Sequence, residues 1–276
     1  MDLIEPVSAL LKEVAEAEIL PRFRNLADHE RMEKGGNDVV TAADHASEAA
    51  LSPVLAKLTP NALIVGEEGA HADPSLLNKL KDAEQAWVID PLDGTRNFAE
   101  GREDFAVMAA LLVNGETAMG WIYQPVSGTM AIAEHGAGTM IDGKRVRIEA
   151  GERALDDMTG EFHFGFLPAQ LRGPVKAAQE RVRVRRPRYC AGATYLNLVR
   201  DPSLYAFYYR LLPWDHAPGS LLYREAGGVA ASFDGSPYWP AAPRKGLLMA
   251  PTQAIWTTVQ RLLFPSIPVL GPALRS

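Results

Sequence analysis

The fold of this chain is decided by the stretch Trp87-Val88-Ile89-Asp90-Pro91-Leu92-Asp93-Gly94-Thr95. Its first three residues are an apolar run that predicts a buried strand, and we expect this strand to turn at Asp90. Pro91 and Gly94 are typical turn residues, and the backbone N–H groups of Gly94 and Thr95 would open the next element. Two carboxylates three residues apart, beside free N–H donors, can hold Mg²⁺ against a phosphate. The stretch therefore predicts metal-dependent cleavage of phosphate monoesters.

The composition is that of an ordinary globular protein. The chain has 276 residues, of which 47% are hydrophobic and 22% are charged, enough for a large core and two subdomains. The net charge of −6 argues against a general nucleic-acid-binding protein. Cys190 is the only cysteine, which excludes an internal disulfide and a cysteine metal cluster and is typical of the reducing cytoplasm.

The N-terminal segment is not typical of a signal peptide. Its apolar residues are interrupted by Asp2, Glu5, Lys12, Glu13 and Glu16, and no charged region precedes an apolar block. No apolar run approaches the length of a membrane span. We therefore expect a cytoplasmic protein without a membrane partner.

The first half of the chain is expected to combine helices with an antiparallel meander. Apolar residues at helical spacing predict an amphipathic helix over residues 3–26, and a short segment, 38–41, leads into a second helix that starts near Asp44. Runs of β-forming residues, separated by turn residues, predict the strands. These strands are expected at 62–65, 87–89, 107–113, 119–123, 130–134 and 139–141.

The second half returns to alternating strands and helices. Strands are expected near 157–162, 183–189 and 204–209, and helices near 168–181, 193–200 and 216–226. The last helix would end at Gly227-Gly228, a typical C-terminal cap. We expect a boundary near residue 150, between an α+β subdomain (1–150) and an α/β subdomain (151–276). Residues 235–276 give no assignment of their own and are expected to complete the second subdomain.

Four segments place acidic residues beside turn residues. They contain Asp38 with Asp44, Glu67 with Glu68, Asp90 with Asp93, and Asp215 after Trp214. A single acid at such a position is usually a helix cap. Four together are harder to explain as caps, because each follows an apolar strand or opens a helix, where the active sites of layered α/β folds collect.

This arrangement resembles the inositol monophosphatase family of Mg²⁺-dependent, lithium-sensitive phosphatases. The residues that carry the resemblance are Gly66-Glu67-Glu68, the run Asp90 to Phe98, Trp214-Asp215 followed by Glu225 to Gly228, the segment Asp38 to Asp44, and Ala133 to Gly138. These motifs follow the family's order and spacing from the first helix to about residue 230. The resemblance implies an α/β fold, a layered α-β-α-β-α sandwich of the sugar-phosphatase type, and a homodimer.

The resemblance also implies roles for individual residues. The metal ligands would be the side chains of Glu67, Asp90, Asp93 and Asp215 and the backbone carbonyl of Leu92, with two to three Mg²⁺ ions bound. Thr95 and Asp44 would orient and deprotonate the attacking water, and the N–H groups of Gly94 and Thr95 would hold phosphate oxygens. Carboxylates are hard donors suited to Mg²⁺, which lowers the pKa of a bound water and stabilises the leaving alkoxide. Attack would be in line, without a covalent phosphoenzyme.

The second half departs from the family in the residues that select the substrate. Family members that prefer inositol phosphate commonly carry a Glu seven residues before the last metal-binding Asp, where this chain has Tyr208. A tyrosine can stack on a ring or donate one hydrogen bond, but it cannot accept two as a carboxylate does. Gly192-Ala193-Thr194 looks like the family's small-residue motif that faces the substrate. The predicted substrate contacts are Asp93, Gly94, Thr95, Gly192, Ala193, Tyr208 and Asp215.

Five arginines fall between residues 181 and 188. Alternation puts Arg181, Arg183 and Arg185 on one face of an expected strand. We favour an exposed strand face over the alternative, a grip on a second phosphate or on RNA. His216 follows Asp215, but a residue one step round a helix points elsewhere, so we interpret it as structural.

We therefore expect a phosphatase that hydrolyses a small polyol or sugar phosphate such as inositol 1-phosphate. Histidinol phosphate, a nucleotide 3′-phosphate and fructose 1,6-bisphosphate are alternative substrates for the same chemistry. A hypothesis of another class is a non-catalytic protein on the same fold that binds RNA or protein through the Arg181–Arg188 run. The complete set of acids argues against that hypothesis.

Overall fold

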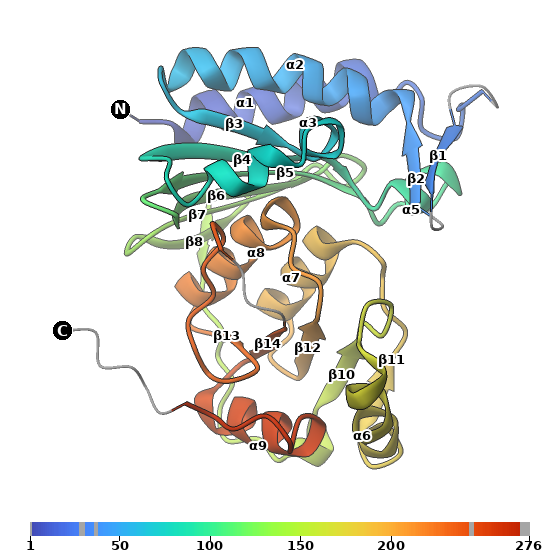
Figure 1. Ribbon diagram of the computed structural model, residues 1–276, viewed down its shortest axis with the longest axis vertical. Coiled ribbons are helices and arrows are strands. Elements are labelled where there is room, and N and C mark those ends of the chain that lie inside the picture. The colour runs from blue at the N-terminus through green and yellow to red at the C-terminus, as the bar shows by residue number, and fades with distance from the viewer. Residues whose placement is uncertain (1, 28–30, 36–37, 243–245, 271–276) are drawn as a thin grey trace.

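The computed structural model describes residues 2–27, 31–35, 38–242 and 246–270, with the backbone alone described for 31–35, 38 and 39. Helices and sheets alternate in five layers (Figure 1): a helical pair, a seven-stranded sheet, a second helical pair, a five-stranded sheet and a last pair of helices. This is the layered α-β-α-β-α sandwich that the resemblance implied, and that expectation is confirmed.

The first layer consists of α1 (Ile4–Val14) and α2 (Ala42–Leu58). A π-helical turn (Ala15–Ile19) extends α1, and the helix predicted over 3–26 ends there because Pro21 cannot donate a helical hydrogen bond. The hairpin of β1 (Arg31–Gly35) and β2 (Asp38–Thr41) leads into α2. Both helices pack apolar side chains against one face of the larger sheet.

The seven-stranded sheet keeps its strands in sequence order. It contains β3 (Leu63–Gly66), β4 (Gln85–Asp93), β5 (Ala106–Val113), β6 (Glu116–Gln124), β7 (Thr129–Glu134), β8 (Gly138–Ile141) and β9 (Lys144–Val146). Only β3 and β4 are parallel, and the crossover between them carries α3 (Glu67–Ala72) and α4 (Ser75–Lys79). The other neighbours pair antiparallel, which is the meander predicted from the sequence.

A bulge in β4 sets the direction of its two aspartates. The strand runs through the turn predicted at Asp90, and the pairing shifts from Asp90 opposite Met108 to Asp93 opposite Ala106. Three residue steps on β4 therefore match two on β5. Pro91 has no N–H to donate and is tolerated at such a bulge. The extra residue resets the alternation, so Asp90 and Asp93 fall on the same side of the sheet.

The middle layer, α7 (Ala191–Arg200) and α8 (Pro213–Glu225), packs between the two sheets. One buried core joins residues of β5 and β6, of both helices and of β12 and β14. Helix α8 lies against β6 at Gly120, where an added Cβ would come within 2.8 Å of the Cα atom of Pro218. The larger sheet therefore buries much of its inner face against helices from much later in the chain, while α3 and α4 cover the part of this face near β3 and β4.

The five-stranded sheet has the order β11-β10-β12-β14-β13. Its strands are β10 (Thr159–Phe162), β11 (Arg183–Arg185), β12 (Leu204–Tyr208), β13 (Val229–Ser232) and β14 (Leu247–Ala250). Its outer face packs against α6 (Ala169–Gln179) and α9 (Gln253–Leu263). Strands β13 and β14 and helix α9 were not predicted, and they complete this sheet and its cover.

Two helix starts differ from the predicted ones. Helix α8 begins at Pro213 rather than 216, because proline is favoured in the first turn, where its missing N–H costs nothing. Helix α7 begins at Ala191 rather than 193, with the Cys190 sulfur accepting the N–H of Ala193. Both changes bring predicted site residues into first helical turns. No helix in the described part of the chain combines the length and the apolar character that crossing a membrane requires.

Candidate metal centre and adjoining cavity

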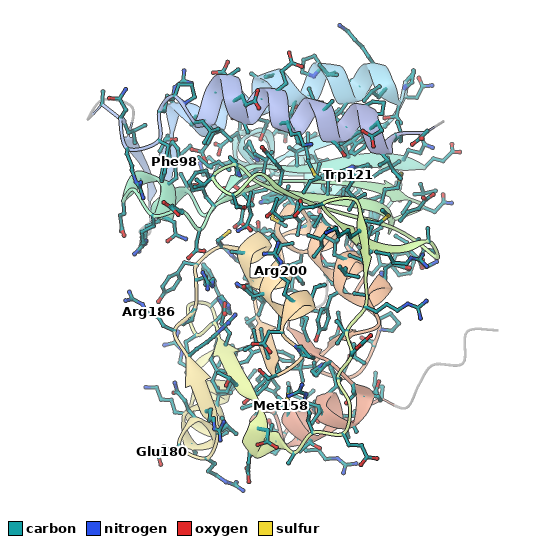
Figure 2. All side chains as sticks on the ribbon, turned by 180° about the vertical axis from the view of Figure 1, so that it is seen from behind. Phe98, Trp121, Met158, Glu180, Arg186 and Arg200 are labelled. Carbon is teal, nitrogen blue, oxygen red and sulfur yellow. The ribbon has the colours of Figure 1, made fainter. Side chains whose placement is uncertain are left out.

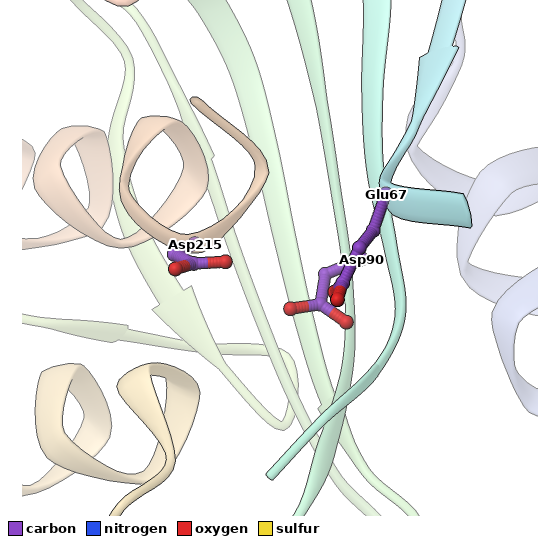
Figure 3. Close-up of side chains that lie close together, drawn as sticks. All are labelled: Glu67, Asp90 and Asp215. Atoms are coloured by element: carbon purple, nitrogen blue, oxygen red, sulfur yellow. The ribbon is translucent and has the colours of Figure 1, made fainter. Parts of the chain in front are cut away.

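Three carboxylates converge from three separate elements (Figure 3). Glu67 is the first residue of α3, Asp90 lies in β4, and Asp215 lies in the first turn of α8. One oxygen atom of each lies within 4.8 Å of the other two, and the described residues contain no second group of this kind. The fold thus brings together three of the four acids predicted from the sequence as metal ligands.

The electrostatics of this trio favour a bound cation. Asp90 is only 2% exposed, and burial raises its pKa well above the usual range. The neighbouring carboxylates of Glu67, Asp93 and Asp215 raise it further. Such a group is stabilised either by protons or by a cation, and carboxylate oxygens are the ligands that Mg²⁺ prefers. The donor set therefore fits Mg²⁺.

Glu48 fixes the start of α3, where Glu67 lies. Its carboxylate oxygens accept hydrogen bonds from the backbone N–H groups of Glu68, at 2.8 Å, and Gly69, at 2.7 Å. An acid at a helix N-terminus stabilises the free N–H groups and the helix dipole. The sequence motifs did not single out Glu48, although it lies one helical turn after Asp44 on α2 and faces the same way. Glu68 is buried, with one oxygen 3.7 Å from Nδ1 of His45.

Asp93, the fourth predicted acid, is held by the first turn of α7. Its Oδ2 accepts hydrogen bonds from the N–H of Gly192 at 2.6 Å and from the Cys190 thiol at 2.9 Å. Its Oδ1 accepts the N–H of Ala191 at 3.1 Å. Burial raises the pKa of Asp93, and these hydrogen bonds partly oppose the rise. The segment resembling the family's small-residue motif thus contacts an acid of the candidate centre through its backbone.

Asp44 and Thr95, to which the family resemblance gives the role of activating water, form a hydrogen-bonded pair. The Thr95 hydroxyl lies 2.9 Å from Oδ1 of Asp44 and 2.9 Å from the carbonyl oxygen of Leu92. The N–H and hydroxyl of Thr41 both donate to Oδ2 of Asp44, at 2.7 Å. Burial raises the pKa of Asp44 to about 6, against the lowering effect of these hydrogen bonds. The side chain of Asp38 lies outside the described residues.

Gly94 makes the turn between β4 and α5 (Thr95–Ala99). Its φ of +86° is in the left-handed region, and an added Cβ would lie 2.8 Å from the carbonyl oxygen of Asp104. Only glycine meets both conditions without strain. The conformation brings Thr95 back toward Asp44 and ends the strand that carries Asp90 and Asp93.

A cavity of about 1040 Å³ opens beside these acids. Its wall includes the acids Glu67, Asp90, Asp93 and Asp215 together with Leu92, Gly94, Thr95 and Tyr208, all of them predicted site residues. The neighbours Cys190 and Ala191 also line it, whereas Gly192 and Ala193 are buried next to them in α7. The Tyr208 ring stacks on the His163 ring with their centroids 4.0 Å apart.

A buried glutamate that the sequence motifs did not single out binds side chains from three segments beside the cavity. Glu161 is 1% exposed and accepts hydrogen bonds from the Thr194 hydroxyl at 2.6 Å and from Nε of Arg185 at 2.8 Å, while Nε2 of His163 lies 3.1 Å away. Burial alone would raise its pKa, but His163, Thr194 and Arg185 lower it to about 2. The signal was present in the sequence, because an acid between Gly160 and Phe162 in a strand needs a partner inside.

The arginine run follows the favoured interpretation at most of its positions. Arg181, Arg183, Arg186 and Arg188 are exposed, and Arg188 donates to Asp104 at 2.7 Å. Arg185 is the exception, because its side chain is turned inward to Glu161. His216 is buried with Nδ1 3.1 Å from the Tyr195 hydroxyl, and burial lowers its pKa to about 3, as expected for a neutral structural residue.

Comparisons with known proteins agree with this geometry. The family model described as "Inositol monophosphatase family" matches residues 2–263. The Nus factor SuhB of Haemophilus influenzae is 32% identical over 235 residues, which cover 82% of this chain and 83% of the relative.

Solved structures share the fold. The extragenic suppressor protein SuhB of Bartonella henselae superimposes with a TM-score of 0.79 at 24% identity, covering 96% of this chain and all of that chain. An IMPase of Thermotoga maritima gives a TM-score of 0.77 at 24% identity, covering 95% of this chain and 97% of that chain. Since both identities are below 25%, these likenesses establish the fold alone.

Proposed function

The chain belongs to the inositol monophosphatase family, and from this premise we propose that it is an Mg²⁺-dependent phosphomonoesterase. The observation that carries the proposal is the convergence of Glu67, Asp90 and Asp215 beside the Asp44–Thr95 pair. The three carboxylates, which repel one another and of which Asp90 is buried, supply the metal site, and the Thr95 hydroxyl, hydrogen-bonded to Asp44, supplies a place for a water. Together these are the parts that hydrolysis of a phosphate ester needs.

Glu67, Asp90 and Asp215 would hold Mg²⁺, with Asp93 and the carbonyl of Leu92 completing a site for two to three ions. Bound Mg²⁺ would neutralise the phosphate, lower the pKa of the attacking water and stabilise the leaving alkoxide. Asp93 keeps a role in this proposal because each carboxylate oxygen can accept more than one partner. Its hydrogen bonds from Gly192 and Ala191 would fix its direction toward the centre.

Thr95 and Asp44 would prepare the water for attack. The Thr95 hydroxyl can accept a hydrogen bond from the water while it donates to Asp44, and Asp44 can then accept a proton. A pKa near 6 suits this task, because the carboxylate is ionised at neutral pH yet remains a useful base. The N–H groups of Gly94 and Thr95 would bind phosphate oxygens. The water would attack in line, without a covalent phosphoenzyme.

The proposed substrate is a small polyol or sugar phosphate such as inositol 1-phosphate, with histidinol phosphate, a nucleotide 3′-phosphate and fructose 1,6-bisphosphate as alternatives. Its contacts would include Asp93, Gly94, Thr95, Tyr208 and Asp215 from the cavity wall, and the Gly192-Ala193 turn behind them. The proposed subdomains, 1–150 and 151–276, would each contribute to this site. The homodimer and the cytoplasmic location remain parts of the proposal, the latter supported by the single cysteine.

Phosphate release from these compounds, with and without Mg²⁺, tests the proposal. We expect Mg²⁺-dependent release from at least one of them and loss of that release when chelator is added. A folded protein that binds Mg²⁺ but releases no phosphate from any phosphomonoester in a broad panel would overturn it.

A second candidate function is binding to RNA or to another protein. The observation that favours it is the identity of 32% to a relative named Nus factor SuhB. Arg181 and Arg183 are exposed and do not line the cavity, so they are the residues of the arginine run that can be tested without disturbing the site. An RNA mobility shift that weakens with salt and is lost in the Arg181→Ala/Arg183→Ala double variant would support this function.

A further inference from the structure

The charged side chains of the cavity wall fall into two groups, one acidic and one basic. All four carboxylates of the lining, Glu67, Asp90, Asp93 and Asp215, belong to the candidate metal centre. The other side chains of the wall that can carry a full charge near neutral pH are arginines and histidines, and most of them come from other segments. Among them are Arg185 and Arg186, in and after β11, and Arg210, in the loop between β12 and α8. A ligand that reaches beyond the metal centre therefore meets positive charge.

Two of these arginines carry charge that no acid among the described residues offsets. Arg185 is neutralised by Glu161, with Nη2 and Nε at 2.7 and 2.8 Å from the same carboxylate oxygen. Arg186 and Arg210 are exposed, and neither makes an ion pair with an acid in the described part of the chain. Figure 2 shows Arg186 at the side of the molecule, just below the seven-stranded sheet. A guanidinium without a carboxylate partner is a ready donor to phosphate or carboxylate oxygens.

Arg210 is also held in place at the wall. Its guanidinium carbon lies 3.7 Å from the centre of the Phe166 ring, a stacking distance that restrains the long side chain. Phe166 is itself 57% exposed and lines the cavity. Ordering a side chain before binding reduces the entropy lost when it engages a ligand. The stacked pair is thus a prepared donor at the cavity mouth.

The wall lacks the acceptor that a neutral polyol would need at the position of Tyr208. The Tyr208 ring is stacked on His163, and the nearby Glu161 directs its oxygens to Thr194, Arg185 and His163. The oxygens of Glu161 are therefore already occupied by protein donors and are not available to a ligand. A hydroxyl-rich leaving group would find few acceptors there, whereas an anionic one would find donors.

We infer that the substrate carries a second anionic group, a phosphate or a carboxylate, in addition to the phosphate that is cleaved, and that Arg186 and Arg210 bind it. This inference rests on the proposed phosphatase function and names the class of its substrate. It distinguishes bisphosphates and phosphorylated acids from simple polyol monophosphates. Because two charged donors would contact the second anion, we expect a preference on the order of tenfold or more in kcat/KM.

The test compares pairs of compounds that differ by one anion, using the full chain with Mg²⁺. The pairs are inositol 1,4-bisphosphate with inositol 1-phosphate, adenosine 3′,5′-bisphosphate with adenosine 3′-phosphate, and 2-phosphoglycerate with glycerol 2-phosphate. We expect the doubly anionic member to be preferred in at least one pair, and the pair that shows it identifies phosphate or carboxylate as the second group. The Arg186→Ala/Arg210→Ala double variant should lose that preference by a rise in KM, while kcat for the singly anionic member is unchanged.

Two further measurements keep the outcomes separate. Arg181→Ala is the matched control, because Arg181 is exposed in the same run but does not line the cavity, and it should leave the preference intact. Calorimetric binding of each pair to the Asp44→Asn variant, which keeps the carboxylate trio, measures the preference without turnover. Equal binding within every pair would overturn the inference even if phosphate is released. Preferential binding without release in the wild type would overturn the proposed function instead.

Discussion

The backbone N–H of Gly192 donates a hydrogen bond of 2.6 Å to Oδ2 of Asp93, between the first turn of α7 and the last residue of β4. This contact joins the middle helical layer to the C-terminal end of β4 in the larger sheet, at the candidate metal centre. The Cys190 thiol donates to the same oxygen at 2.9 Å. Asp93 therefore has two tasks, since it holds α7 against β4 and supplies charge to the centre.

Replacement of Asp93 by asparagine should separate these tasks. The amide oxygen can still accept the N–H of Gly192, but the amide group carries no negative charge and its N–H₂ would face donors. We expect phosphate release to fall by roughly 100-fold or more, because Asp93 is a ligand of the centre in the proposed function and this variant removes its charge. Circular dichroism should show an unchanged fold. Full activity in this variant would remove Asp93 from the metal centre.

Two replacements of Thr95 test the water-activating pair. Thr95→Val removes the hydroxyl that links Asp44 to the site while keeping the side-chain shape, and kcat should fall about 10²- to 10⁴-fold. Thr95→Ser keeps the hydroxyl and should retain most of the activity. Steady-state kinetics on a substrate found in the panel would compare the two. Similar losses in both variants would point to packing rather than to the hydroxyl.

Glu48 should act on the metal centre through the start of α3. Glu48→Gln cannot accept both N–H groups as a carboxylate does, so the first turn of α3 and with it Glu67 should be less firmly held. We expect the Mg²⁺ concentration for half-maximal activity to rise by about tenfold, the loss of affinity typical when a residue that holds a metal ligand in place is replaced. Glu13→Gln, at an exposed position of α1, is the control and should not change it. An unchanged Mg²⁺ requirement with reduced stability would make Glu48 purely structural.

The pH dependence of stability should depend on Mg²⁺. Burial raises the pKa of Asp44 to about 6 and that of Asp90 well above its usual range. Without metal, the folded chain thus holds protons that the unfolded chain releases, and the free energy of unfolding should fall as pH rises from about 4 through 6. Mg²⁺ replaces those protons, so it should raise Tm more at pH 8 than at pH 5. Thermal melts at both pH values check this, and equal increments would contradict it.

The sequence predicted many of the strands, and it singled out three acids that the fold brings together, because both depend on local patterns. Apolar runs, turn residues and the order of the motifs were enough for β4 to β8 and for Glu67, Asp90 and Asp215. The bulge at Pro91 was missed, because a proline followed by a glycine within three residues is typical of a turn as well as of a bulge. Whether the strand continues there depends on its pairing with β5.

Glu48 and Glu161 were missed for a different reason. Each is an acid whose meaning depends on partners distant in sequence, the N–H groups of α3 for Glu48 and Arg185 for Glu161. A charged residue on a helix face is most often solvated, and the strand position of Glu161 indicates that it needs a partner without revealing which residue supplies it. Strands β13 and β14 were also missed, because they become strands by pairing with each other and, for β14, with β12, which their own residues do not reveal.

The shared middle layer has a consequence for how the protein is made. The seven-stranded sheet is complete at Val146, but α8, which covers its inner face, ends only at Glu225. At about 5–20 residues per second, the ribosome needs several seconds to deliver the missing segment. During that interval the part of the apolar sheet face that packs against α7 and α8 is uncovered. We expect the nascent chain to engage chaperones over this window, and truncations that end between these two points to aggregate rather than to fold as a smaller unit.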